Sequence, residues 1–176
     1  MKIIGVAVML ALCINANGQN SCFTVSKDPK NDEVVFSGRV TFSDLNSEPS
    51  FTWLKDGRDE YKPDDKATTF LMEHLQNYTF TIFMGTWCSD SQDMLPRLEK
   101  VLQTVGYPES SVTMYGVDRT KKTKNGESKK SRINLVPTVI LQKDGKEIGR
   151  ITETAHKSVE ADITSMIKKD MAKTRH

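Results

Sequence analysis

The 176-residue sequence lacks three features that would assign it to a class at once: a Cys-x-x-Cys pair, a strong net charge and a metal-binding histidine cluster. Its three histidines, His74, His156 and His176, have no metal-ligand spacing. The formal charge of +2 gives no overall signal for nucleic acid or an acidic membrane surface. With 37% hydrophobic and 27% charged residues, the composition is that of one globular domain. We therefore predict no metal, no cofactor, no nucleic-acid partner and no stable membrane span.

The first eighteen residues have the pattern of a secretory signal. A lysine provides a positive start, residues 3–14 are apolar but too few for a permanent span, and Ala16 and Gly18 are small residues before a cleavage site. We expect cleavage before Gln19 and a periplasmic or secreted protein. An N-terminal core helix is one alternative. A lipoprotein anchored at Cys13 is another, and it is disfavoured because a large leucine precedes the cysteine.

Residues 19–50 predict a lead-in and one strand ahead of the main domain. Residues 19–32 are polar and contain a proline, which indicates an irregular segment carrying Cys22. Residues 34–42 alternate apolar and polar side chains, as a strand with one buried face does. Residues 51–61 surround an Asp-Gly pair, which predicts a β-hairpin because both residues tolerate positive φ.

The rest of residues 51–176 predicts an α/β domain. A helix capped by Asp64 precedes a continuous apolar strand and a second helix that starts at Ser89. The expected elements are helices over residues 66–76, 89–105 and 156–169, and strands over residues 79–84, 112–117, 139–141 and 147–151. Parallel crossovers come first and a hairpin comes last.

Cys88 is the residue with the clearest chemical signal. It leaves the strand over residues 79–84 and opens a helix, where unpaired N–H groups and positive potential favour thiolate over thiol. Ser91 can offer its hydroxyl to the sulfur but cannot form a disulfide. Asp90 places a carboxylate in the same turn, where it either disfavours a second negative charge or serves as an ordinary helix-capping residue.

A basic stretch over residues 119–132 is the only biased segment. Its seven cations face a single carboxylate, Glu127, and they are Arg119, Lys121, Lys122, Lys124, Lys129, Lys130 and Arg132. In an open α/β sheet, ligands bind beyond the carboxyl ends of the strands, where this stretch emerges. It either forms a solvated loop, raises the potential near Cys88 or attracts an acidic partner.

Together with Trp87-Cys88, the run Val136-Pro137-Thr138 and the turn Asp-Gly-Lys-Glu-Ile-Gly-Arg resemble the thioredoxin superfamily over roughly residues 51–170. The set is also similar to exported bacterial thioredoxin-like proteins with a Trp-Cys-x-Asp-Ser site. The resemblance implies a three-layer sandwich, with a central mixed β-sheet flanked by helices, here with an N-terminal β extension. It implies that Cys88 is the nucleophile, that Pro137 is a cis-proline, and that Trp87, Val136 and Thr138 contact substrate.

Two departures from that pattern change the expected activity. Ser91 replaces the resolving cysteine, and Ile82 stands where thioredoxins carry a buried aspartate. We therefore expect a monothiol protein whose Cys88 forms mixed disulfides with protein or low-molecular-weight thiols and needs an external resolving thiol or reductase. Cys22 is a possible internal resolver. The alternative is a non-catalytic peptide-binding module; glutaredoxin-like and peroxidase readings fit less well.

Overall fold

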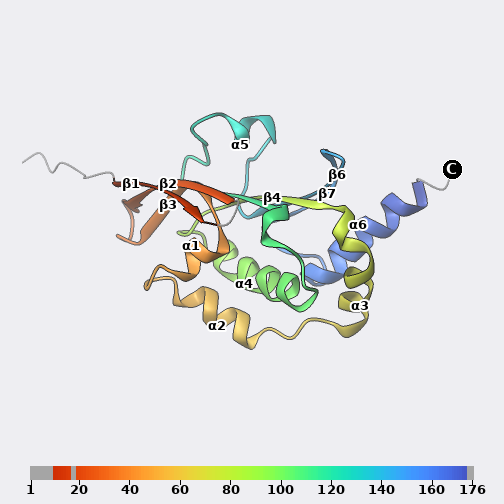
Figure 1. Cartoon of the computed structure of the whole chain (residues 1–176). Helices are drawn as coiled ribbons and strands as arrows, with labels where there is room; N and C mark the ends of the chain where they lie inside the picture. Colours follow the sequence, from red (N-terminus) through yellow and green to blue (C-terminus); the bar gives the residue numbers. More distant parts are fainter. Residues whose placement is uncertain (1–9, 17–18, 174–176) are drawn as a thin grey trace, which may run out of the picture.

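The computed structural model describes residues 10–16 and 19–173, with side chains from Cys22 onward. One seven-stranded mixed sheet runs through it in the order β1-β2-β3-β5-β4-β6-β7 (Figure 1). The strands are β1 (Leu10–Ala16), β2 (Gln19–Lys27), β3 (Val34–Val40), β4 (Thr79–Met84), β5 (Val112–Gly116), β6 (Thr138–Lys143) and β7 (Lys146–Thr152). Only β4 and β5 are parallel; the other neighbours are antiparallel.

Six α-helices accompany the sheet within the described residues. They are α1 (Phe42–Asn46), α2 (Thr52–Glu60), α3 (Asp65–His74), α4 (Ser89–Thr104), α5 (Glu127–Lys130) and α6 (Val159–Lys173), with short 3-10 turns η1 (Leu75–Asn77) and η2 (Glu109–Ser111). The predicted cap of α3 is confirmed, because the Asp64 carboxylate accepts a hydrogen bond from the Ala67 N–H. Among the helices described, none is long and apolar enough to cross a membrane.

The two faces of the sheet are covered unequally. The long helices pack on one face, where Ile82, Met114 and Val139 share a large core with residues of α2, α3, α4 and α6 (Figure 1). On the other face, Phe83 and Ile140 belong to a smaller cluster beneath the segment that contains α5. The predicted mixed sheet flanked by helices is confirmed, with one thick helical layer and one thin layer.

The predicted hairpin over residues 51–61 is wrong, because this stretch forms helix α2. Its Asp-Gly pair is not a turn: Gly57 has no positive φ. Instead, Gly57 allows α2 to approach α4 closely, since a Cβ at this position would lie 2.9 Å from the Cβ of Pro96. Leu54 is buried on the same helix. The glycine therefore serves packing between helices, which a local turn signal cannot distinguish.

The amino-terminal region also differs from the expected irregular lead-in. Residues Gln19–Lys27 form β2, which pairs with β3 because Phe23 packs on the core and stacks on Phe36 with ring centroids 4.5 Å apart. Of the predicted signal sequence, residues 1–9 and 17–18 lie outside the described residues. The stretch between them, Leu10–Ala16, forms β1 against β2.

Candidate functional site

The site is built where β4 ends and α4 begins. Cys88 is the N-cap residue of α4, and its thiol is half-buried and free. The thiol Sγ donates a hydrogen bond to the carbonyl oxygen of Val136 at 3.2 Å. The Val136–Pro137 peptide bond is cis, as predicted. The fold thus brings Cys88 to the Val136–Pro137 pair, which begins 48 positions later in the sequence.

The turn between β4 and α4 is held by its own hydrogen bonds. The Cys88 N–H donates to the Gly85 carbonyl at 3.0 Å, and the side chain of Gln92 donates to the Thr86 carbonyl at 2.8 Å. The hydroxyl of Thr86 donates to the Val34 carbonyl at 2.8 Å, which ties the turn to β3. A turn fixed at both ends presents the Cys88 sulfur at a defined position.

Ser91 does not interact with the sulfur as the sequence suggested. Its side chain is fully buried, and its Oγ accepts a hydrogen bond from the Gly85 N–H at 3.2 Å. Within the described chain it makes no hydrogen bond to Cys88. The Gly85 N–H, which follows the last residue of β4, donates to this hydroxyl. Ser91 therefore stabilises the turn between β4 and α4.

Trp87 is held between two groups that sequence reasoning did not connect. Its indole N–H donates to the Val117 carbonyl at 2.8 Å, and the guanidinium of Arg119 lies over the ring, 4.6 Å from its centroid. The Arg119 Nε in turn donates to the carboxylate of Asp28 at 2.7 Å. Asp28 lies in the turn between β2 and β3, so the amino-terminal strands contribute to the position of Trp87.

The Asp28 carboxylate is buried, yet its surroundings favour the ionised form. Burial raises the pKa of Asp28. The hydrogen bonds from Arg119 and from the Lys30 N–H, together with the Arg119 charge, outweigh burial, so the pKa is lowered. Only 1% of the Asp28 side chain is exposed, against 32% for Arg119. No sequence signal pointed to Asp28, which lies 91 positions from its partner.

The residues around the cis-proline present backbone groups to the site. The N–H of Val136 makes no hydrogen bond within the part of the chain that is described, whereas its carbonyl accepts from Cys88. The Thr138 hydroxyl donates to the Leu135 carbonyl at 2.7 Å and is buried, so this side chain supports the loop instead of projecting outward. Leu135 itself is 41% exposed beside them.

Two other positions from the sequence analysis, Asp90 and Ile82, have a defined place in the structure. Asp90 lies in the first turn of α4 and forms no ion pair with any described residue. Ile82 is fully buried between Met114 and Val139, so no carboxylate lies under the site at that position. No group of three or more histidines, cysteines or carboxylates in the described ranges could hold a metal ion.

Cys22 lies on β2, three strands away from β4, the strand that leads into Cys88. It pairs with Arg39 on β3, which pairs with Tyr115 on β5, which pairs with Phe83 on β4. Three strand spacings separate Cys22 from β4 by roughly 14 Å, and a disulfide needs Cα atoms within about 7 Å. In this structure no disulfide joins Cys22 and Cys88, so the internal resolver considered from the sequence has no support from this arrangement.

Comparison with known proteins agrees with this architecture. The thioredoxin family model matches residues 64–169, which is more than half of the chain. Mitochondrial thioredoxin-3 from Saccharomyces cerevisiae is 30% identical over 84 residues, which cover 48% of this chain and 61% of that protein. The chain thus spans less than two thirds of this relative's length.

Two solved structures share the fold at low sequence identity. A protein of unknown function from Pseudomonas aeruginosa is 11% identical with a TM-score of 0.59, over 75% of this chain and 93% of its own. An HIV epitope scaffold is 11% identical with a TM-score of 0.56, over 74% of this chain and 93% of its own. At such identity, the likeness concerns the fold alone.

Proposed function

Because the chain belongs to the thioredoxin family, we propose that it carries out thiol–disulfide exchange through Cys88 as a monothiol protein. The observation that carries the proposal is the half-buried Cys88 thiol at the N-terminus of α4, 3.2 Å from the carbonyl that precedes cis-Pro137. A helix N-terminus stabilises developing negative charge on sulfur. The Val136 N–H is available to an extended peptide laid beside the sulfur.

The exchange proceeds in two balanced steps. The Cys88 thiol gives up its proton and attacks one sulfur of a partner disulfide, which forms a mixed disulfide and releases the other sulfur as a thiol. A second, external thiol then attacks the mixed disulfide, restores Cys88 and carries the partner sulfur away in a new disulfide. Ser91 supplies no sulfur for this second step, so the external thiol or reductase is required.

A trapping experiment tests this proposal. Full-length protein with Cys13→Ser and Cys22→Ser is mixed with oxidised glutathione, quenched in acid and weighed by mass spectrometry. We expect one glutathione adduct, and we expect none after a further Cys88→Ser substitution. The proposal would be contradicted if Cys88 formed the glutathione adduct more slowly than the cysteine of an unstructured peptide does.

The second candidate is a peptide-binding module that uses the surface around Trp87, Cys88 and Pro137 without turnover. The unpartnered Val136 N–H and the exposed Leu135 favour it, because both can hold an extended peptide without any sulfur chemistry. In that case Cys88→Ser leaves the capture of cysteine-free peptides intact. Loss of all captured peptides in this variant would contradict the module.

We also propose that the protein is exported, with residues 1–18 removed. The positive start, the short apolar stretch and the small residues before Gln19 support this. β2 then becomes the edge strand, since β1 belongs to the removed segment. The mass of the protein recovered from a cell envelope or culture supernatant tests it: a chain starting at Gln19 supports export, a lipid-modified Cys13 supports anchoring, and an intact Met1 contradicts both.

A further inference from the structure

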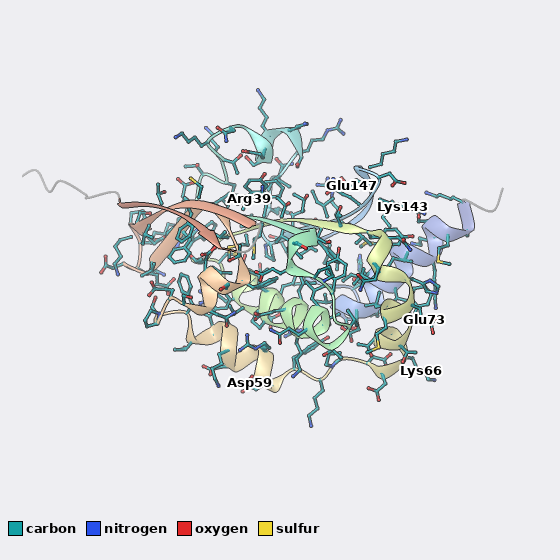
Figure 2. All side chains as sticks on the ribbon, in the orientation of Figure 1. Arg39, Asp59, Lys66, Glu73, Lys143 and Glu147 are labelled. Atoms are coloured by element: carbon teal, nitrogen blue, oxygen red, sulfur yellow. The ribbon has the colours of Figure 1, made fainter. Side chains whose placement is uncertain are left out.

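The basic segment, residues 119–132, concentrates the positive charge of the molecule in one place. Its seven cations and one carboxylate sum to +6, whereas the whole chain carries +2, so all other residues together sum to −4. The segment arches over the thinly covered face of the sheet (Figure 1). Arg39 projects from β3 on the same side (Figure 2). This face is therefore strongly positive on a protein that is otherwise acidic.

The charges of the segment are not neutralised by the rest of the described chain. Arg119 pairs with Asp28, but none of the other six cations lies within 4.0 Å of a carboxylate in the described residues. The one acidic residue, Glu127, accepts a hydrogen bond from the Asn125 side chain instead. Six uncompensated cations on one face create a potential that an anionic partner can use.

The segment holds these cations on a fixed frame. Ser128 is buried, and it exchanges hydrogen bonds with Thr123: its N–H donates to the Thr123 hydroxyl at 2.9 Å, and its Oγ accepts from the Thr123 N–H at 3.2 Å. The Ile133 N–H donates to the Ser128 carbonyl at 2.8 Å. A frame of this kind lowers the entropy that the protein loses when a partner binds.

Within this frame lies a cavity of about 540 Å³. Its lining includes Lys121, Lys122, Lys129, Arg132, Ile133 and Asn134. Both ends of the segment border the thiol site. Arg119 lies over Trp87, and Ile133, the residue that follows the segment, packs on the cluster that contains Val136 and against which Cys88 also packs. A chain seated in the cavity thus lies beside Ile133, which packs on the same cluster as Cys88.

We propose that this cavity binds an acidic stretch of the polypeptide whose disulfide is attacked by the Cys88 thiol. The inference rests on the proposed exchange function and adds the class of its partner. The cavity is far larger than one phosphate, and no aromatic side chain lines it, so it offers no platform for stacking bases. Its charge comes mainly from lysines, which act as point charges, and only Arg132 provides the planar fork suited to phosphate. Carboxylates along a peptide fit this arrangement best.

The test uses two peptides that differ only in charge. Each contains one cysteine activated as a mixed disulfide, flanked on both sides by glutamates in one peptide and by glutamines in the other. We expect wild-type Cys88 to react about tenfold faster with the glutamate peptide, as steered association allows. The preference should vanish near 1 M salt, where the screening length falls to about 3 Å.

A matched pair of charge-reversal variants isolates the segment. Lys122→Glu, Lys129→Glu and Arg132→Glu together change exposed cavity positions. The control is Lys62→Glu, Lys66→Glu and Lys146→Glu. It changes the total charge by the same amount at exposed positions outside the cavity. The first variant should lose the preference for glutamate, and the control should keep it.

The outcomes separate this inference from the exchange function. If wild-type protein reacts with both peptides at equal rates, or if both variants behave alike, the acidic-peptide site is overturned while the exchange function stands. If it reacts with neither peptide, the exchange function itself fails. Stoichiometric binding of a single-stranded oligonucleotide, without any preference for the glutamate peptide, would also overturn the proposal.

Discussion

Gly85 is the position at which a single methyl group should disturb the site most. A Cβ at Gly85 would lie 2.7 Å from Cε2 and 2.8 Å from Nε1 of Trp87, well inside ordinary contact. Gly85 has no positive φ, so the effect of Gly85→Ala comes from this contact and not from backbone strain. The indole must retreat by roughly 1 Å to restore normal separation.

That retreat weakens both contacts that hold Trp87. The hydrogen bond to the Val117 carbonyl contributes about 0.5–1.5 kcal/mol, and the Arg119 guanidinium over the ring contributes about 0.5–1 kcal/mol. Alanine in place of glycine returns about 0.4–1 kcal/mol by restricting the unfolded chain. We expect a net loss of about 0.5–2 kcal/mol in the free energy of unfolding.

Urea unfolding measures this loss, and fluorescence in a Trp53→Phe background reports the surroundings of Trp87, since the chain has two tryptophans. We expect a shifted emission maximum as well as lower stability. In a Trp87→Ala background, Gly85→Ala should be neutral or slightly stabilising. Unchanged stability and emission in the first background would refute the described packing of Trp87 on Gly85.

Two further predictions concern the frame around the site. Gly57→Ala should destabilise the protein by up to about 2 kcal/mol in urea unfolding, because overpacking against Pro96 exceeds the helix-propensity gain of about 1 kcal/mol. In a Pro96→Gly background, which removes the Cβ and Cγ that the new methyl group would meet, the same change should stabilise, and the same sign in both backgrounds would contradict the contact of α2 with α4. Asp28→Asn should flatten the acid dependence of stability: because the pKa of Asp28 is lowered from 3.8, its contribution is full above that pH and is lost as pH falls through the folded value. Unfolding midpoints between pH 7 and pH 2 measure this, and identical profiles for wild type and variant would argue against the Arg119 pair.

The sequence predicted the turn that carries Cys88 because its signals are local. β4 is marked by a continuous apolar run, and α4 by apolar residues at helical spacing after Ser89. Cys88 lies between them, so the three features fall within one short stretch. The Val136–Pro137 turn could be added through resemblance to a known family, and the structure brings its carbonyl to the Cys88 sulfur.

The remaining features depend on contacts between distant residues. Gly57 has the local signature of a turn, and only the neighbouring helix shows that it is a packing glycine. The pairing of Arg119 with Asp28 joins residues 91 positions apart, and no periodicity or motif marks it. The Ser91 hydroxyl accepts from the Gly85 N–H, which is only six positions away. This interaction still depends on how the turn closes and has no sequence signal.

The lifetime of the mixed disulfide tests the central claim most directly. A well-placed second thiol acts with an effective concentration of roughly 10⁵ M, about eight orders of magnitude above a 1 mM external thiol. Ser91→Cys should therefore convert a Cys88–glutathione adduct rapidly into an internal disulfide. Ser89→Cys, which places a thiol on the exposed side of the same turn, is the matched control.

The measurement is a time course of intact mass after oxidised glutathione is added to each protein in the Cys13→Ser and Cys22→Ser background. We predict that the adduct persists in the protein with Ser91 and in Ser89→Cys until external thiol is added, and that it disappears in Ser91→Cys. The monothiol account would be contradicted if, without added thiol, the protein with Ser91 lost the adduct as fast as Ser91→Cys does.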